Sequence, residues 1–202
     1  GAASKRAGKA KWGGQIASGK AITGMGLLHN TTHNKVIVSA GTAWYYADGT
    51  NAGVALTGVT FTNNLDTDFA QAIDRLYGAN GTDKLAYTTD GVAITEQTSN
   101  GNVGRWPTYY NQRLYMTNTT FPDRVYYSNP YTIDLTSSPP TFSTAIFGTF
   151  DTALAPSTPV SNKNAGYFTL MPGGGVEITR LFQDNQGASD YLYAYTKQHG
   201  TW

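Results

Sequence analysis

The stretch NQRLYMTNTTFPDRVYYSNP, from Asn111 to Pro130, has the residue pattern of a β-hairpin. Two short runs of apolar and aromatic residues, Leu114–Met116 and Val125–Tyr127, are separated by a polar turn. An arginine comes shortly before each run, at Arg113 and Arg124. Aromatic and β-branched residues favour strands, and a polar segment between two such runs favours a turn. The stretch therefore predicts two paired antiparallel strands.

Three relatives of this hairpin occur elsewhere in the chain. They are NKVIVSAGTAWYYADG (34–49), DRLYGANGTDKLAYTTDG (74–91) and DYLYAYTKQHGTW (190–202). The four copies start at residues 34, 74, 112 and 190, so the intervals are 40, 38 and 78, and the last is twice 39. A period near 40 residues with several strands in each period is typical of β-propeller blades. No copy is visible near residue 151, where FGTFDTALAPSTPVSN stands, which indicates a degenerate blade or a long connection.

These patterns predict an all-β fold, a β-propeller or part of one, with blades of about 40 residues. We expect residues 1–20 to form a basic N-terminal arm and residues 21–202 to form the propeller-like domain, with four to five blades. The segment Leu65–Leu76 has apolar residues at helical spacing, but it overlaps a repeat, so only a short turn is predicted there. The run Thr132–Pro159 is rich in Ser, Thr and Pro and is predicted to be mostly loop. Further strands are expected at Ala21–Leu28, Gly53–Phe61, Gly91–Thr95, Tyr167–Met171 and Val176–Phe182.

The composition agrees with a β-protein and excludes some kinds of site. The 202 residues include 23 glycines and 14 tyrosines but no cysteine, so disulfides and thiolate metal sites are excluded. Charged residues make up only 13% of the chain, and Gly, Asn, Thr, Ser and Tyr are abundant. Low charge with much Thr, Asn and Tyr is common in extracellular and virion β-proteins. No run of 18 apolar residues occurs, so no segment is predicted to span a membrane.

Positive charge gathers at the start of the chain, although the net charge is only +1. No acidic residue precedes Asp48. One interpretation is a solvated, flexible arm, and the other is an arm that lies on an acidic partner or on nucleic acid. The cations of this arm are Lys5, Arg6, Lys9, Lys11 and Lys20.

The sequence contains no recognisable catalytic or metal-binding constellation. His29 and His33 are four residues apart, which is a metal-ligand spacing on a helix, but they lie in a predicted turn without an evident third ligand. Asp66 with Asp68, and the segment Asp184–Gly187, lack the ligand series of a calcium loop. We therefore predict no cofactor and no metal.

No sequence pattern indicates a hydrolase. A glycosidase needs two carboxylates facing one cleft, and nothing selects a pair among the thirteen acids. The segment Thr88–Thr95 has a loose likeness to the Asp-containing turns of sialidases, with the wrong spacing. The glycines Gly173–Gly175 lack the lysine and the following helix of a phosphate loop.

Aromatic residues are the best candidates for contacts with other molecules. Tyrosines in the repeat strands are expected to pack between blades, or else to form a sugar platform or a protein interface. An aromatic segment before the third hairpin is expected in a loop, where its side chains would be exposed. The predicted partner contacts are Trp106, Tyr109, Tyr110, Phe121 and Pro122.

Three segments together resemble a family of phage virion propeller proteins. They are GKAITGMGLL (19–28), YYNQRLYM with PDRVYYSNPYTID (109–134), and GGGVEITRLFQDNQGASDYLYAYTKQHGTW (173–202). The resemblance covers roughly residues 20–135 and 173–202 and consists of strand and turn patterns. The matching residues are Asn111, Arg113, Leu114, Tyr115, Arg124, Tyr127, Ser128, Pro130, Ile178, Leu181, Tyr191 to Tyr193 and Trp202.

The resemblance implies a location in the virion and a structural role. Members of this family form nozzles, hubs or stabilising rings below the portal of short-tailed phages, surround the DNA channel, bind neighbouring tail proteins and are not enzymes. They are usually much longer, which implies a part of such a protein or a small relative. We therefore expect a homo-oligomeric ring in the tail or head–tail complex, in proximity to DNA and not to a membrane. The alternatives are a carbohydrate-binding propeller, such as a lectin or receptor-binding tail protein, and a glycoside hydrolase.

Overall fold

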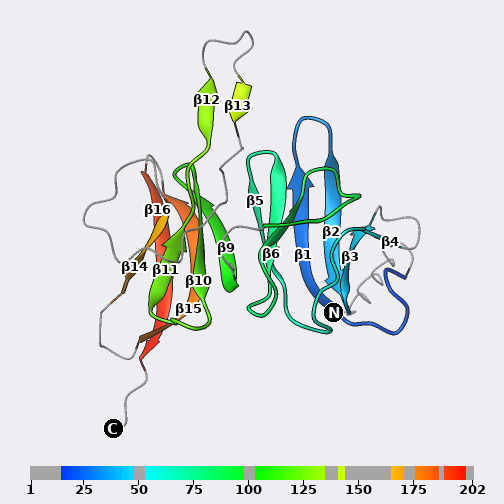
Figure 1. Cartoon of the computed structure of the whole chain (residues 1–202), viewed down its shortest axis with the longest axis horizontal. Coiled ribbons are helices and arrows are strands. Elements are labelled where there is room, and N and C mark those ends of the chain that lie inside the picture. Colours follow the sequence, from blue (N-terminus) through cyan, green and yellow to red (C-terminus); the bar gives the residue numbers. More distant parts are fainter. Residues whose placement is uncertain are drawn as a thin grey trace, which may run out of the picture.

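The computed structural model describes residues 15–47, 53–97, 103–134, 141–143, 165–170, 176–186 and 189–198. These residues form sixteen β-strands and no helix, which confirms the all-β prediction (Figure 1). Consequently, the described part of the chain holds no helix long and apolar enough to cross a membrane. Three sheets have four strands each, and two further pairs of strands complete the fold.

The strands follow the chain in order through the sheets. The first sheet consists of β1 (Ile22–His29), β2 (Asn34–Ala40), β3 (Ala43–Ala47) and β4 (Val54–Ala55). The second sheet consists of β5 (Asp68–Ala72), β6 (Arg75–Ala79), β7 (Ala86–Thr88) and β8 (Thr95–Glu96). The third sheet consists of β9 (Gly104–Tyr110), β10 (Arg113–Asn118), β11 (Arg124–Tyr127) and β14 (Gly166–Thr169). The two strand pairs are β12 (Thr132–Asp134) with β13 (Thr141–Ser143), and β15 (Val176–Gln186) with β16 (Ser189–Gln198).

Every pairing within these sheets is antiparallel, and three of the four predicted hairpins are present; of the fourth copy (190–202) only the first strand, β16, lies within the described residues. The opening hairpin pairs Tyr115 with Tyr127, and its earlier relatives pair Ile37 with Tyr46 and Tyr77 with Tyr87. The four copies therefore begin at the second strand of each unit: β2, β6, β10 and β16. In the fourth unit only the first two strands, β15 and β16, lie within the described residues, and we call them the ribbon.

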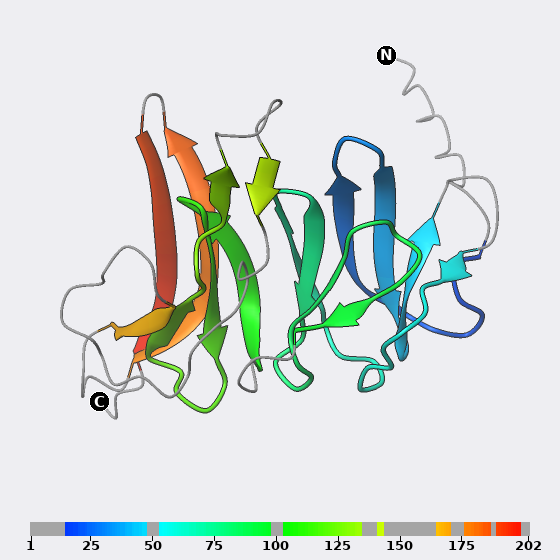
Figure 2. The same cartoon turned by 45° about the horizontal axis from the view of Figure 1, so that its top comes forward.

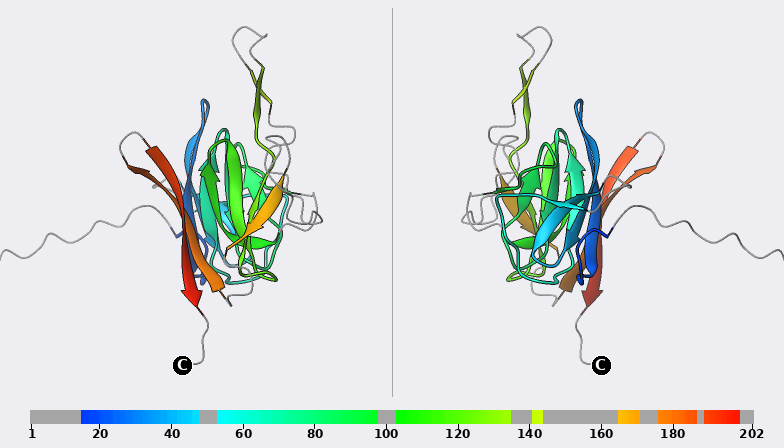
Figure 3. Two further views of the ribbon diagram at one scale, coloured as in Figure 1. Left: turned by 90° about the vertical axis from the view of Figure 1, so that its left-hand side faces the viewer. Right: turned by 90° about the vertical axis from the view of Figure 1, so that its right-hand side faces the viewer.

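The missing copy near residue 151 is explained by a long connection inside the third unit. After β11 the chain forms the β12–β13 pair, which projects from the body of the molecule (Figure 3), and it returns much later as β14. Strand β14 pairs with β11 in register from Arg124–Thr169 to Tyr127–Gly166 and so completes the third sheet. The interval of 78 residues between the third and fourth copies therefore contains one long unit and no additional one. Part of the predicted loop Thr132–Pro159 forms β12 and β13, and residues 135–140 and 144–159 lie outside the described residues.

Three further local predictions differ from the structure. Of the strand expected over Gly91–Thr95, only Thr95 lies in a strand, β8. The segment Leu65–Leu76 forms β5 and the beginning of β6, joined at Ile73 and Asp74, because pairing along Asp68–Ala79 outweighs the helical spacing. Ile73 has a φ of 56°, in the left-handed region that tight hairpin turns use. The strand expected over Gly53–Phe61 is limited to β4, followed by a single parallel bridge from Thr57 to Ala93.

Successive units pack face to face, and their first strands lie side by side (Figure 2). Strand β1 lies beside β5, β5 beside β9, and β9 beside β15. A separate apolar cluster fills each junction. Between the first and second sheets it contains Leu28, Ile37, Trp44 and Leu76; between the second and third it contains Tyr77, Leu85, Leu114 and Met116; between the third sheet and the ribbon it contains Val125, Ile178 and Leu181.

Glycines permit the close approach of the first two sheets. A Cβ atom on Gly26 of β1 would lie 2.6 Å from the Cβ atom of Phe69 on β5. Such a separation is far shorter than the optimal distance of about 3.5–4.0 Å between carbon atoms. Phe69 in turn packs edge-on against Trp44, with ring centroids 4.9 Å apart. The small residue on β1 therefore makes room for the aromatic contact at the centre of this junction.

We predict that Gly26→Ala lowers the free energy of unfolding by about 1–3 kcal/mol, because the added methyl group overpacks the junction. The backbone of Gly26 does not have a positive φ, so the cost is steric. Denaturation by urea would measure the change. The matched control is Thr95→Ala on the exposed edge strand β8, which should change the free energy by less than about 0.5 kcal/mol. Equal effects of the two substitutions would contradict the role of the glycine.

Candidate interaction surfaces

A cation rests on a tyrosine ring at the same position in each four-stranded sheet. The cation lies at the start of the second strand, and the tyrosine lies on the third strand. In each sheet the tyrosine pairs with the residue that comes two positions after the cation. The distances from the cation to the ring centroid are 4.9 Å for Lys35 and Tyr46, 4.8 Å for Arg75 and Tyr87, and 5.4 Å for Arg113 and Tyr127. The three contacts fasten the second strand to the third, with the geometry of a cation–π interaction. We call them the cation–tyrosine contacts.

Each of these cations also binds a second group. Lys35 donates to the carbonyl of Asp90 at 2.7 Å, and Arg113 donates to the carbonyl of Ser128 at 2.6 Å. The guanidinium of Arg75 binds the carboxylate of Asp74 at 2.8 Å. Arg75 and Arg113 are buried, where such charge-assisted hydrogen bonds are stronger than in water. The charged residues of the repeat therefore stabilise the hairpins.

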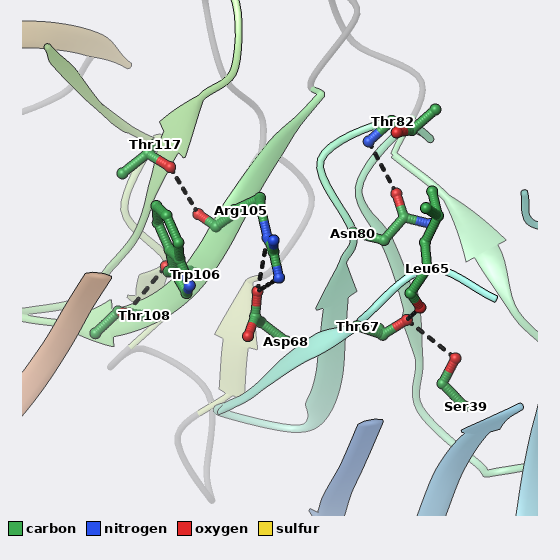
Figure 4. A network of polar contacts seen from close by, with 10 residues as sticks. All are labelled: Ser39, Leu65, Thr67, Asp68, Asn80, Thr82, Arg105, Trp106, Thr108 and Thr117. Carbon is green, nitrogen blue, oxygen red and sulfur yellow. Dashed lines mark hydrogen bonds and ion pairs between the residues drawn. The ribbon is translucent and has the colours of Figure 1, made fainter. Parts of the chain in front are cut away.

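Polar side chains join the sheets at their junctions (Figure 4). The hydroxyl groups of Ser39 and Thr67 lie 3.0 Å apart between the first and second sheets. The guanidinium of Arg105 binds the carboxylate of Asp68 at 3.1 Å between the second and third sheets. This pair was not singled out from the sequence, because the two residues are far apart in the chain. Asp68 is thus an ion-pair partner of Arg105.

Turn side chains add links between the units. The Asn30 amide donates to the carbonyls of Asp74 and Thr89, both at 2.8 Å, and its oxygen accepts the N–H of His33. The carboxylate of Asp83 accepts hydrogen bonds from Thr62 and from Asn80. Burial opposes the ionisation of Asp83, but these hydrogen bonds outweigh it and hold the pKa of the carboxyl below its usual value.

The residues weighed for metal binding are used in structural contacts or turns. The backbone N–H of His29 donates to the side chain of Gln71, which donates back to the carbonyl of His29. Asp184 lies on β15, opposite Tyr191, so the segment that was compared with a calcium loop runs into the hairpin of the ribbon. Within the described ranges, no group of three His, Asp or Glu side chains could hold a metal ion.

The aromatic segment predicted as a loop is strand β9, and this prediction was wrong. Trp106 and Pro107 lie opposite Met116 alone, because the pairing of β9 with β10 shifts register there. Trp106 has a φ of 52°, a left-handed value that bulges accommodate, and its half-buried ring packs on the cluster of Val125, Ile178 and Leu181. The bulge therefore turns the tryptophan towards the ribbon.

Of the other predicted contact residues, Pro122 lines a cavity of about 320 Å³ together with Trp106, whereas Tyr109, Tyr110 and Phe121 are not part of its lining. Tyr109 is half-buried against the core between the second and third sheets, and burial together with the neighbouring Tyr131 raises the pKa of its phenol. Tyr110 packs near Tyr115 at a centroid distance of 6.0 Å. Phe121 and Pro122 are exposed in the β10–β11 turn, where Arg124 lies 4.0 Å from the ring of Phe121. Their contacts with a partner stay a prediction.

The basic arm can be followed only at its last cation. Lys5, Arg6, Lys9 and Lys11 lie outside the described residues. Lys20 is exposed and lines a cavity of about 360 Å³ beside Met25 and Val38. Its side chain also passes over Gly41, where a Cβ atom would collide with it. Lys20 therefore lies against the first sheet.

Two exposed apolar faces are the most distinctive surfaces of the described structure. One is the outer face of β1, with Ile22, Met25 and Leu27, and the other is the outer face of the ribbon, with Phe182, Tyr191, Tyr193 and Tyr195. The alternation in DYLYAYTK already places the three tyrosines on one side of a strand. The sequence does not tell which side of that strand would be covered. We call these surfaces the β1 face and the ribbon face.

Comparisons of the chain with known protein families, with curated proteins and with solved structures give no match.

We predict that Arg113→Ala lowers the free energy of unfolding by about 2–4 kcal/mol. The loss combines the cation–tyrosine contact with a buried carbonyl of Ser128 that is left without its charged donor. Arg113→Lys should lose less, because it keeps the cation near Tyr127. Chemical denaturation measures the two variants, with the exposed Arg180→Ala as control. A loss at Arg113 no larger than that at Arg180 would contradict the account.

Proposed function

We propose that the chain is a structural and assembly protein of a bacteriophage particle, located in the tail or head–tail complex. The observation that carries this proposal is a series of face-packed sheets in which, among the described residues, apolar side chains are exposed on the outer side of the first unit and of the last. Exposed apolar patches of this kind on a protein surface indicate contact with another protein. The sequence resemblance to phage virion propellers supports the same role.

A propeller-like arrangement is the finer part of the proposal. The first two units are four-stranded antiparallel meanders of consecutive strands, and the third has the same strand order with β14 as its last strand. Their first strands lie next to one another, as the innermost strands of neighbouring blades do. In the assembled particle, such units would form a ring around the DNA channel. The basic arm would then lie near the DNA or on an acidic neighbour.

Immunogold electron microscopy tests the location. Antibodies raised against the purified chain are applied to phage particles isolated from the cells that produce it. The proposal predicts gold label at the tail or at the junction of head and tail, and label that is lost when the antibody is first absorbed with the chain. Particles without label, with the protein recovered only in the particle-free fraction, would contradict the proposal.

The basic arm should supply contact with DNA but not stability. Replacing Lys5, Arg6, Lys9 and Lys11 by Gln should weaken binding to a DNA duplex, with a salt slope reduced by about 0.9 for each phosphate that the arm no longer neutralises. The melting temperature should not fall. Fluorescence anisotropy at several salt concentrations and thermal unfolding measure the two effects. The matched control removes four cations elsewhere: Lys84, Lys163, Arg180 and Lys197.

Comparison of the arm variant with the control shows whether DNA binding depends on the arm itself or only on net charge. Equal loss of affinity in the arm variant and in the control would mean that only net charge matters. A collapse of the fold in the arm variant would mean that the arm is structural. Either result would contradict a role of the arm in contact with DNA.

A carbohydrate-binding function is the second candidate, and the exposed tyrosines of the ribbon favour it. Aromatic rings on an open strand face offer a platform on which sugar rings can stack. A glycan array separates the candidates, because a protein that serves only in particle assembly should retain no glycan. Retention that depends on Tyr193 and Tyr195 would favour the carbohydrate-binding function.

A further inference from the structure

The β1 face is the side of β1 that points away from the second sheet. Gly24 and Gly26 point towards β5, where Cβ atoms in their place would meet Thr67 and Phe69. Residues of opposite orientation on the strand therefore point away from the second sheet. Met25 is 70% exposed and Leu27 is 51% exposed on that outward side. Among the described residues nothing covers Met25 and Leu27 on this side, whereas Val38, opposite Met25 on β2, is buried.

A cavity lies next to the β1 face and adds depth to it. It has a volume of about 360 Å³ and is lined by Ile16, Ala17, Lys20, Met25 and Val38 among others. This is the size range of pockets that hold a small organic group. Its lining is aliphatic, apart from Gln15 and the lysine. The β1 face therefore offers a recess beside a flexible methionine side chain.

The ribbon face is the uncovered side of the last unit. On one side of the ribbon, Leu181 and Ala194 pack on the third sheet. On the opposite side, Phe182 stacks between Tyr193 and Tyr195, at centroid distances of 5.1 and 5.2 Å and interplanar angles of 14° and 17°. Tyr195 is nevertheless 60% exposed. The ribbon thus carries an ordered row of aromatic rings with no covering layer in the described structure.

The two faces are complementary to each other in chemistry. The β1 face supplies a recess and a polarisable thioether, and the ribbon face supplies rings that project from a flat strand pair. Contacts of methionine sulfur with aromatic rings are favourable by about 0.3–1.5 kcal/mol each. Tyrosine is also enriched at protein interfaces, because it buries a large apolar area and keeps a polar tip.

The junctions inside the chain show how such a contact is formed. Three times, one unit covers a face of the preceding unit, and β1, β5, β9 and β15 follow one another at the junctions. A further unit placed on the ribbon face would continue the same series. The first unit of another copy carries the matching uncovered face.

We propose that the β1 face of one copy binds the ribbon face of the next copy. The partner is a second copy of this chain, and the interface is heterologous, which gives a closed ring or a filament according to the rotation between copies. The inference rests on the proposed assembly function, for which it names the partner. The contact itself is a property of the isolated chain and can be tested on it.

Mixing two variants tests the pairing. The first variant, Met25→Lys with Leu27→Lys, blocks the β1 face, and the second, Tyr193→Lys with Tyr195→Lys, blocks the ribbon face. Light scattering coupled to size-exclusion chromatography should show wild-type mass above 21.7 kDa that rises with concentration, and each variant alone at 21.7 kDa. An equimolar mixture should form a two-chain complex that grows no further, because one intact face of each kind remains.

Controls keep the test independent of folding. Circular dichroism and melting temperature must agree between variants and wild type, and the milder pair Leu27→Ser and Tyr195→Ser should weaken association in the same direction. Val54→Lys and Val92→Lys place a charge at exposed apolar residues outside both faces and should leave the wild-type association unchanged.

Each other outcome overturns the proposal in a recognisable way. A ribbon-blocked variant that still associates by itself would indicate contact between two β1 faces, and a β1-blocked variant that does so would indicate contact between two ribbon faces. A wild type that stays at 21.7 kDa at every concentration would exclude the contact. If the chain were also retained on a glycan array, the tyrosines of the ribbon face would be assigned to carbohydrate binding. If immunogold labels the phage tail but the wild type is monomeric, the proposed function stands and the interface between copies is wrong. If the wild type associates but phage particles carry no label, the interface between copies stands and the proposed function is wrong.

Discussion

Face-to-face packing of successive sheets is the constraint on which the rest of this structure depends. A four-stranded sheet with apolar residues on both sides is stable only when something covers each side. The junctions are filled by large side chains such as Trp44 and Tyr77, and they close tightly because Gly26 has no side chain on β1. In the described part of the chain, one apolar face of the first unit and one of the last unit have no neighbouring sheet. It therefore connects the stability of the chain with its proposed assembly.

The cation–tyrosine contacts stabilise each sheet locally, in addition to the packing between sheets. They recur at intervals of 40 and 38 residues, from Lys35 to Arg75 to Arg113, and they join the same two strands each time. A cation on a strand would be unfavourable in a buried sheet without a partner. Here the tyrosine ring and a nearby carbonyl or carboxylate supply that partner, so the repeat can carry a charge into the interior.

The hairpins could be predicted from the sequence, because strand and turn preferences act over a few residues. A strand near β14 was predicted, but the doubled interval could not be resolved, because the pairing of β14 with β11 across a long connection leaves no local pattern. The helical spacing of Leu65–Leu76 was overridden by pairing with partners outside that window. The site could be predicted less well than the fold. Whether Trp106 or Tyr195 is exposed depends on which side of its strand the next unit covers, and this is a long-range property.

Hydrogen–deuterium exchange at low and high protein concentration tests the central claim most directly. Local opening sets the exchange of amides near a free face, so covering that face should slow it. The account predicts slower exchange at high concentration in peptides that cover Ile22–His29 and Ser189–Gln198, with no change in the edge strands Val54–Ala55 and Thr95–Glu96. Exchange independent of concentration, or slowing confined to other strands, would contradict the claim that the uncovered faces of the first and last units bind each other.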